Sequence, residues 1–395
     1  MATRARIAGV GLGEFNTPRK SRSYDVIAEE AIREALADAR VDLSAIDQVY
    51  AGYVYGDSTS GQNALYRVGM PGVPVVNVNN NCATGSSALW LARQAVESGA
   101  SECVLAVGFE QMRRGALDAQ WADRPTPFDR FDRLAEELHG PAPGVPMAAR
   151  YFGGAGQEYA QRYGTEPETF ARIAVKARRH AARNRHAVFR DPVTVDDVLA
   201  SPRMFGMLTR LQCCPPTCGA AAAVVCTSDF AARHGLDAPV EIAAQAMTTD
   251  QPSSFDPPDF IRLVGYDMSV RAARLVYEAA GVSPEEIPVV ELHDCFTSNE
   301  ILSYEALSLT PEGTAEKFVR DGDNTYGGRV VVNPSGGLLS KGHPLGATGL
   351  AQCAELVWQL RGQAGARQVD GATLALQHNL GLGGACVVSL YRRVG

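Results

Sequence analysis

The chain has 395 residues, of which 46% are hydrophobic and 21% are charged, and its formal net charge is -7. This composition is ordinary for a folded globular protein of two or three domains, and it excludes collagen, a disordered chain and a coiled coil. The mild acidity argues against a nucleic-acid partner, and no apolar run approaches the roughly 20 residues of a membrane span. We therefore expect no nucleic-acid partner and no integral membrane association.

The N-terminal residues, MATRARIAGVG, are interpreted as the first strand and not as a signal peptide, because no long apolar segment follows the basic residues. The chain also contains nine cysteines. Without an export signal, an odd number of cysteines spread over such a length favours a reducing compartment over a disulfide framework. We expect a cytoplasmic protein of bacterial type.

Strand-like and helical segments alternate along the first quarter of the chain. The expected elements are a strand at 6–10, a helix at 24–39, strands at 49–54 and 75–78, a helix at 86–97 and a strand at 102–107. Such alternation predicts an α/β fold whose strands are largely parallel.

The pattern loosens between residue 113 and about residue 204. Joints rich in proline and glycine separate polar helical pieces there, such as 167–184. Strand-like sequence resumes at 220–227 and again at 240–247. We interpret the intervening segment as a mostly helical insertion.

The second half of the chain repeats features of the first. AIREAL at 31–36 and AARLVY at 272–277 each precede a strand at the same distance, and TGSSAL at 84–89 and TGLAQC at 348–353 each begin a helix that leads to a strand. Chance similarity between two βαβ units is the alternative. The matched order of two separate units favours a duplication, with the two α/β halves arranged around one shared site.

Cys82 is the first candidate for chemistry. It lies in NNNCATGS at 79–86, between an expected strand and an expected helix. A sharp turn of this kind exposes a nucleophile, and the N-terminus of the helix favours the thiolate by lowering its pKa. A buried small hydrophobe is the alternative for a lone cysteine, but this context favours a nucleophile.

Two histidines lie on loops that follow strands. His343 stands between glycines in GHPLGATG at 342–349, where a ligand can approach the backbone and the imidazole is well placed as a base. His293, Asp294 and Cys295 follow a strand together, and they fit either a metal half-site or an acid/base pair. No CxxC or HxxxH spacing completes a metal site, so we expect no metal.

The remaining motifs carry weaker signals. The glycine-rich QHNLGLGG at 377–384 directs backbone N–H groups at an oxyanion or forms a tight turn. The basic run at 176–185 is interpreted as a solvated helix face, with a site for ligand phosphates as the alternative. A further group of cysteines is interpreted as packing thiols: Cys213, Cys214, Cys218 and Cys226.

Together, NCATGS, HDCF, NPSGG, GHPLGATG and HNLG resemble the motifs of the thiolase superfamily, in that family's order and over essentially the whole chain. The HDCF and HNLG forms resemble the sterol-carrier-protein-type thiolases, which cleave 3-oxoacyl-CoA, often with 2-methyl-branched or sterol side-chain acyl groups. The resemblance implies a thiolase fold, in which two duplicated βαβαβαββ halves form a five-layer αβαβα sandwich with an inserted helical loop domain. It divides the chain into an N-terminal half (1–118 and 205–240), a loop domain (119–204) and a C-terminal half (241–395).

The resemblance also implies catalytic roles. Cys82 would be the acyl-accepting nucleophile, activated by His343, and Cys295 would be the acid/base residue. His293 would belong to the oxyanion hole of the thioester enolate. Backbone N–H groups of Cys82 and Gly381 would form a second hole, for the tetrahedral intermediate.

The same resemblance leads to expectations for three further parts of the chain. Ser335 and Gly336 would contact coenzyme A. Asn379 stands where better-known thiolases carry the cysteine of a CxG motif. Relatives usually read Pro-Thr-Ser-Asp-Gly where this chain reads PPTCG at 215–219, so the local loop geometry and its acyl or CoA contacts are in doubt.

The expected activity is therefore ping-pong thiolysis of 3-oxoacyl-CoA by an acyltransferase, with coenzyme A as co-substrate and no tightly bound cofactor. The resemblance implies a homodimer or homotetramer, and some members of the family are peroxisomal, although YRRVG carries no peroxisomal signal. Two alternatives remain. One is a condensing enzyme like ketosynthase III, which has no need of Cys295, and the other is a non-catalytic thiolase-like protein that binds a lipid or a partner.

Overall fold

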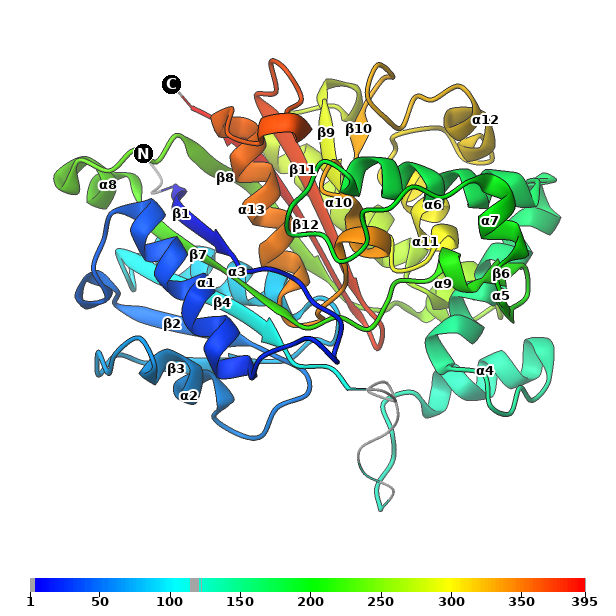
Figure 1. Ribbon diagram of the computed structural model, residues 1–395, viewed down its shortest axis with the longest axis horizontal. Coiled ribbons are helices and arrows are strands. Elements are labelled where there is room, and N and C mark those ends of the chain that lie inside the picture. The colour runs from blue at the N-terminus through cyan, green and yellow to red at the C-terminus, as the bar shows by residue number, and fades with distance from the viewer. Residues whose placement is uncertain (1–3, 114–120, 122, 395) are drawn as a thin grey trace.

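The computed structural model describes residues 4–113, 121 and 123–394, and Figure 1 shows the arrangement of the elements. The first half of the fold contains β1 (Ala5–Leu12), α1 (Tyr24–Ala39), β2 (Gln48–Gly52), α2 (Ser60–Tyr66), β3 (Val75–Val78), α3 (Thr84–Glu97), β4 (Cys103–Glu110), β7 (Gly219–Thr227) and α8 (Ser228–His234). The second half contains β8 (Val240–Thr248), α9 (Phe260–Leu263), α10 (Tyr266–Ala280), β9 (Val289–Glu291), α11 (Thr297–Ala306), α12 (Ala315–Arg320), β10 (Val331–Val332), α13 (Thr348–Arg361), β11 (Leu374–Gly381) and β12 (Ala385–Arg393).

The strand order confirms the duplication that the sequence predicts. The first half has the order β3-β2-β4-β7-β1, and the second half has the equivalent order β10-β9-β11-β12-β8. In each half the first three strands of this order are parallel and the last two pair antiparallel. A short antiparallel pairing of β1 with β8 joins the two halves into one ten-stranded order.

Helices cover both sheets and fill the space between them. Helices α3 and α13 contact each other and pack on strands of both halves, so they form the central layer. Helix α1 packs on β1 and β7, and α10 packs on β8 and β12, so these two helices form the outer layers (Figure 1). The result is the expected five-layer αβαβα arrangement, in which α3 and α13 both begin near the centre of the molecule.

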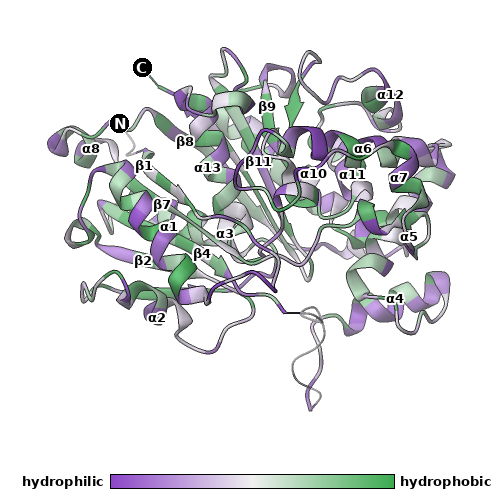
Figure 2. Cartoon of the chain, in the orientation of Figure 1, coloured by the Kyte–Doolittle hydropathy of each residue, from purple (hydrophilic) through white to green (hydrophobic). Residues whose placement is uncertain are grey.

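The segment between β4 and β7 is largely helical, as expected. It contains α4 (Asp129–His139), α5 (Met147–Tyr163), α6 (Pro167–Ala181), α7 (Val195–Ala200) and a hairpin of β5 (Arg203–Phe205) and β6 (Leu208–Thr209). Figure 2 shows hydrophilic residues gathered on these peripheral helices, whereas the central strands are mostly hydrophobic. The domain limits stay a prediction, and the expected boundary at 118/119 lies outside the described residues.

Burial explains the alternation of sequence patterns. Strand β7 is buried along its whole length, which accounts for its run of alanine and valine, whereas α1 buries only the face that carries Ile27, Ala31 and Leu36. Within the described ranges, no helix is both long enough and apolar enough to cross a lipid bilayer.

Candidate active site

Cys82 lies on a sharp turn between β3 and α3. The preceding residue, Asn81, has a φ of 51°, and the side chain of Thr84 stabilises the turn through two hydrogen bonds. The Thr84 hydroxyl accepts a hydrogen bond from the Asn80 N–H at 2.8 Å and donates to the Asn81 carbonyl at 2.6 Å. This strand–turn–helix geometry presents the Cys82 side chain to a cavity, as the motif predicts.

His343 precedes α13 in the second half of the chain, and its hydrogen bonds fix its tautomer. Its Nδ1 lies 2.7 Å from the hydroxyl of Thr348, and that hydroxyl donates its own proton to the Pro344 carbonyl at 3.0 Å. The hydroxyl therefore accepts from Nδ1–H, which leaves a lone pair on Nε2. Burial lowers the pKa of His343 to about 3, with a smaller contribution from Lys341, so the ring is a neutral proton acceptor at pH 7.

His293 has the opposite tautomer, which a chain of hydrogen bonds determines. The amide of Gln377 donates to the Ser86 hydroxyl, and that hydroxyl donates to Oδ1 of Asn379, each at 2.8 Å. The Asn379 amide group therefore donates through Nδ2, to Nδ1 of His293 and to the Cys82 carbonyl, each at 3.1 Å. Because Nδ1 of His293 accepts, its proton resides on Nε2, and the ring is a hydrogen-bond donor toward the cavity.

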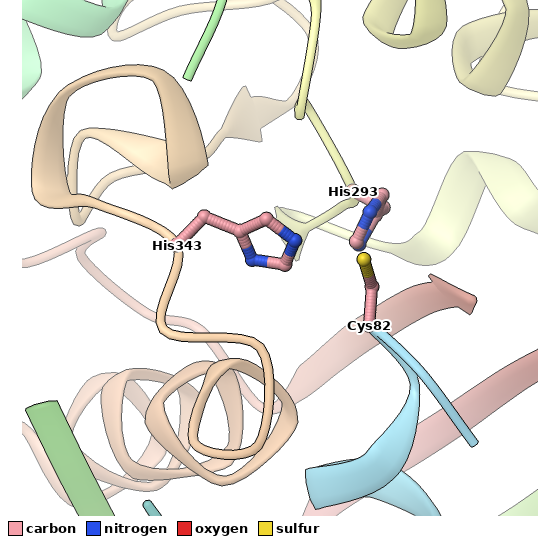
Figure 3. A group of neighbouring side chains, drawn as sticks. All are labelled: Cys82, His293 and His343. Carbon is pink, nitrogen blue, oxygen red and sulfur yellow. The ribbon is translucent and has the colours of Figure 1, made fainter. Parts of the chain in front are cut away.

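These three side chains converge from both halves of the fold (Figure 3). The Cys82 sulfur and one nitrogen of each histidine all lie within 4.8 Å of one another. The two imidazole rings are 5.0 Å apart between centroids and nearly perpendicular, at 85°. A thiol, a proton acceptor and a proton donor therefore face the same small volume, which is an arrangement suited to nucleophilic attack on a carbonyl group.

The protonation state of Cys82 differs from the sequence-based expectation of a lowered pKa. Burial raises the pKa of the Cys82 thiol well above its usual range, and the negative charge of Glu110 raises it further. This desolvation outweighs the effect expected from the N-terminus of α3. The resting residue is a thiol, so its proton must move to His343 as the sulfur attacks.

The same three residues can also hold a metal ion, although we expected none. Cysteine and histidine are ligands that Zn²⁺ accepts, and the three ligand atoms lie close enough together. Binding through Nε2 of His293 would require that its proton move to Nδ1, which would break the hydrogen bond from Asn379. The absence of a metal stays a prediction.

Two more thiols line the same cavity, whose volume is about 550 Å³. Cys295 is 4% exposed, and burial raises the pKa of its thiol well above the usual range. The N–H of Cys214 donates to the carbonyl of Cys295 at 2.9 Å, and both residues face the cavity together with Cys82. The sequence interpretation placed Cys214 among packing thiols, because the contact depends on a pairing of segments far apart in the chain.

Gly381 contacts the turn that carries Cys82. A Cβ atom at this position would lie 2.2 Å from the Asn80 carbonyl and 3.0 Å from the Ala83 nitrogen, so only glycine fits. Asp294, in contrast, is not part of the cavity. Its buried carboxylate accepts hydrogen bonds from the N–H groups of Leu338 and Leu339, so it holds the segment that leads to His343.

Ser335 and Gly336 do not line the cavity. The Ser335 hydroxyl donates to the buried carboxylate of Glu291 at 2.8 Å, and Gly336 packs against Ala181. Their full burial does not support the expected CoA contacts.

Part of the basic run on α6 also has structural partners. Lys176 is buried in an ion pair with Glu300, and His180 is hydrogen-bonded to the Asn333 carbonyl at 2.9 Å. These two residues are therefore not a solvated face, and neither one is available to a ligand phosphate.

The unusual PPTCG segment runs directly beside the site. Pro216 forms an isolated parallel bridge with His343, and both Pro215 and Pro216 line the cavity. The buried Cys218 thiol contacts the Met112 carbonyl at 3.4 Å. Backbone pairing thus holds the segment in place.

Comparisons with known proteins agree with this geometry. Family models described as thiolase N-terminal domain and thiolase C-terminal domain-like match residues 7–229 and 249–390. The chain is 54% identical to human sterol carrier protein 2, and the match covers 98% of this chain and 72% of that protein. It is 35% identical to a benzoylsuccinyl-CoA thiolase subunit of Thauera aromatica, and this match covers 95% of this chain and 94% of that subunit. Among solved structures, a chain of the Ltp2-ChsH2(DUF35) aldolase superposes with a TM-score of 0.83 at 26% identity, covering 99% of this chain and 98% of that one.

The two family models together span nearly the whole chain, and the identity to sterol carrier protein 2 extends through both halves that build the site. The chain belongs to the thiolase family.

Proposed function

We propose that this protein is a 3-oxoacyl-CoA thiolase, an acyltransferase that cleaves 3-oxoacyl-CoA with coenzyme A during the oxidation of fatty-acid, branched-chain or sterol side-chain acyl groups. The products are a shortened acyl-CoA and acetyl-CoA or propionyl-CoA. One observation carries the proposal, namely that Cys82 faces two histidines of opposite tautomer. Family membership and the identity to sterol carrier protein 2 support it.

In the first half-reaction, the Cys82 sulfur attacks the 3-oxo carbon while its proton moves to Nε2 of His343. The N–H groups of Cys82 and Gly381 are proposed to stabilise the resulting alkoxide. Its collapse breaks the bond between C2 and C3 and leaves an acyl group on Cys82. The electron pair passes to the thioester enolate, which accepts a hydrogen bond from Nε2–H of His293.

Cys295 completes both half-reactions. Its thiol protonates C2 of the enolate, which releases acetyl-CoA or propionyl-CoA and leaves a thiolate on Cys295. That thiolate then removes the proton of the incoming CoA thiol, which attacks the acyl group on Cys82. The leaving Cys82 sulfur recovers its proton from His343. The elevated pKa of the Cys295 thiol suits this role, because the thiol stays protonated until the enolate forms beside it.

Two adjoining cavities support binding of an acyl-CoA. The cavity at Cys82 is lined largely by apolar side chains, which suits an acyl chain. A larger cavity of about 1020 Å³ shares Asn81, Val145 and Leu382 with it, and Arg124 and Arg150 lie along its wall. We assign the pantetheine and phosphate groups of coenzyme A to this larger cavity.

The free thiols bear on the cellular compartment in which the enzyme works. All nine cysteines are free, and the mechanism requires that Cys82 stay reduced. This requirement favours a reducing compartment such as the bacterial cytoplasm. A homodimer is proposed as the basic unit, and light scattering of the purified protein measures it.

Covalent trapping tests the proposal. After incubation with acetyl-CoA, mass spectrometry should find an acetyl group on the peptide that contains Cys82. The Cys295→Ala variant should still form a measurable amount of this adduct, because CoA can leave as a thiolate, but it should not cleave 3-oxoacyl-CoA, because protonation of the enolate depends on Cys295. Cys226→Ala, which changes a core thiol of β7, is the matched control and should keep both activities. An unacylated Cys82 would favour a binding protein, and an unaffected overall rate in Cys295→Ala would favour a ketosynthase-like set of catalytic residues.

A further inference from the structure

Glu110 is a buried carboxylate at the end of β4, next to the active site. It is 1% exposed, and its oxygens accept three backbone N–H groups. Val54 and Gly346 donate to Oε2 at 3.1 and 3.0 Å, and Tyr55 donates to Oε1 at 3.0 Å. Among the described residues no lysine or arginine forms an ion pair with Glu110, and the three backbone N–H groups are the hydrogen-bond donors that the structure gives its carboxylate.

The three donors belong to different halves of the fold. Val54 and Tyr55 follow β2 in the first half, whereas Gly346 lies three residues after His343 in the second half. The contact at Gly346 is close, because a Cβ atom there would lie 2.4 Å from the Phe109 carbonyl. The loop of His343 therefore packs against the ends of β2 and β4, and Glu110 supplies a polar contact across this junction, in addition to the bridge between Pro216 and His343.

The charge of Glu110 works against the nucleophile. It raises the pKa of the Cys82 thiol, and it also raises the pKa of the Cys218 thiol. Burial raises the pKa of Glu110 itself to about 7. A carboxylate that opposes formation of the thiolate does not serve the reaction through its charge, so its contribution lies in the position of the groups that it holds.

We propose that Glu110 is a positioning residue, whose two carboxylate oxygens fix the His343 loop of the second half to the first half that carries Cys82. The base then reaches the thiol only while this junction is intact. This role rests on the proposed thiolase reaction. A wild-type protein without turnover would refute the reaction, whereas equal turnover in wild type and variant would refute only the role of Glu110.

The decisive variant is Glu110→Gln, which removes the charge and leaves one acceptor oxygen for three N–H groups. We expect kcat for thiolysis to fall roughly 10- to 100-fold with little change in KM, as for other residues that orient a catalytic group. The pH midpoint for alkylation of Cys82 by iodoacetamide should move to lower pH at the same time, because a negative charge beside the thiol is gone. A residue that only stabilised the fold would not move turnover and thiol reactivity in opposite directions.

Two further variants complete the experiment. Glu110→Asp keeps the charge but shortens the side chain, so kcat should fall while the pH midpoint for alkylation of Cys82 stays at the wild-type value. If Glu110→Gln does not fold, this variant tests the proposal in its place. Glu241→Gln changes a buried carboxylate of β8 that pairs with Arg4 and Arg392, and it should change neither quantity. Wild-type kcat in the Glu110 variants, or a joint loss of turnover and alkylation, would overturn the proposal.

Discussion

The loops that precede α3 and α13 occupy equivalent places in the two halves, yet they carry different chemistry. Both helices begin with threonine and glycine, at Thr84 and at Thr348. The Thr84 hydroxyl bonds to two backbone groups and so shapes the turn around Cys82. The Thr348 hydroxyl bonds to one backbone carbonyl and to the imidazole of His343, so it selects a tautomer.

This difference shows how a duplicated scaffold divides a catalytic task. Two helix starts of the same construction meet at the centre of the molecule, and one of them supplies the nucleophile while the other supplies its base. Neither half holds a complete site. In both loops the hydroxyl of the first-turn threonine accepts one hydrogen bond and donates another.

The largest expected effect on the rate of thiolysis comes from removing the nucleophile of the first loop. Cys82→Ala should lower the rate of thiolysis by roughly 10⁴-fold or more, since no acyl-enzyme can form. The assay is the disappearance of 3-oxoacyl-CoA measured by chromatography. Near-normal turnover in this variant would show that the two loops do not divide the task as described.

An intermediate effect is expected from parallel substitutions of the two threonines. Thr348→Val should lower kcat roughly 10- to 100-fold, because Nδ1 of His343 loses its acceptor and the ring loses its preferred tautomer. Thr348→Ser keeps the hydroxyl and should restore most of the activity. Thr84→Val should slow acylation of Cys82 but keep the pH profile of the wild type. A changed pH profile in Thr84→Val would contradict the contrast between the two loops.

The smallest effect concerns stability away from the two loops. His180 is fully buried on α6, and its pKa is lowered to about 3 by burial, with Lys176 as the next cause. In the unfolded chain His180 binds a proton near its ordinary pKa of 6.5, whereas in the folded protein it stays neutral down to about pH 3. Its contribution to the free energy of unfolding therefore decreases as the pH falls from 6.5 toward 3.

We therefore expect the difference in the free energy of unfolding between wild type and His180→Asn to narrow below pH 6.5, by up to about 1.4 kcal/mol per pH unit. Urea titrations at several pH values measure it. A difference for His180→Asn that stays constant over this pH range would refute the predicted titration of His180.

Much of the fold could be predicted from the sequence because periodicity and duplication are local signals. The helix at 24–39 and the strand at 75–78 have the predicted limits, and the repeated TG motifs correctly identified α3 and α13 as equivalent. The motif residues Cys82, His343 and His293 also meet as expected. Each of them follows a strand, and the ends of strands gather at one place in such folds.

The rest depended on contacts that no local pattern encodes. The position of Cys214 in the cavity follows from its backbone hydrogen bond to Cys295, and the proposed role of Glu110 follows from its contact with Gly346 in the other half. The raised pKa of the Cys82 thiol results mainly from desolvation, and the degree of burial cannot be inferred from a sequence motif. The expected CoA contact of Ser335 stays a prediction, and the structure shows its hydroxyl donating to the buried carboxylate of Glu291.

The hydrogen-bond chain from Gln377 through Ser86 to Asn379 crosses between the halves, and this has a consequence for biosynthesis. Ser86 is synthesised well before Gln377 and Asn379, with which it forms this chain of hydrogen bonds. During synthesis the growing chain carries Cys82 with neither His343 nor an oriented His293. The site is therefore assembled only after both halves have been synthesised and have docked.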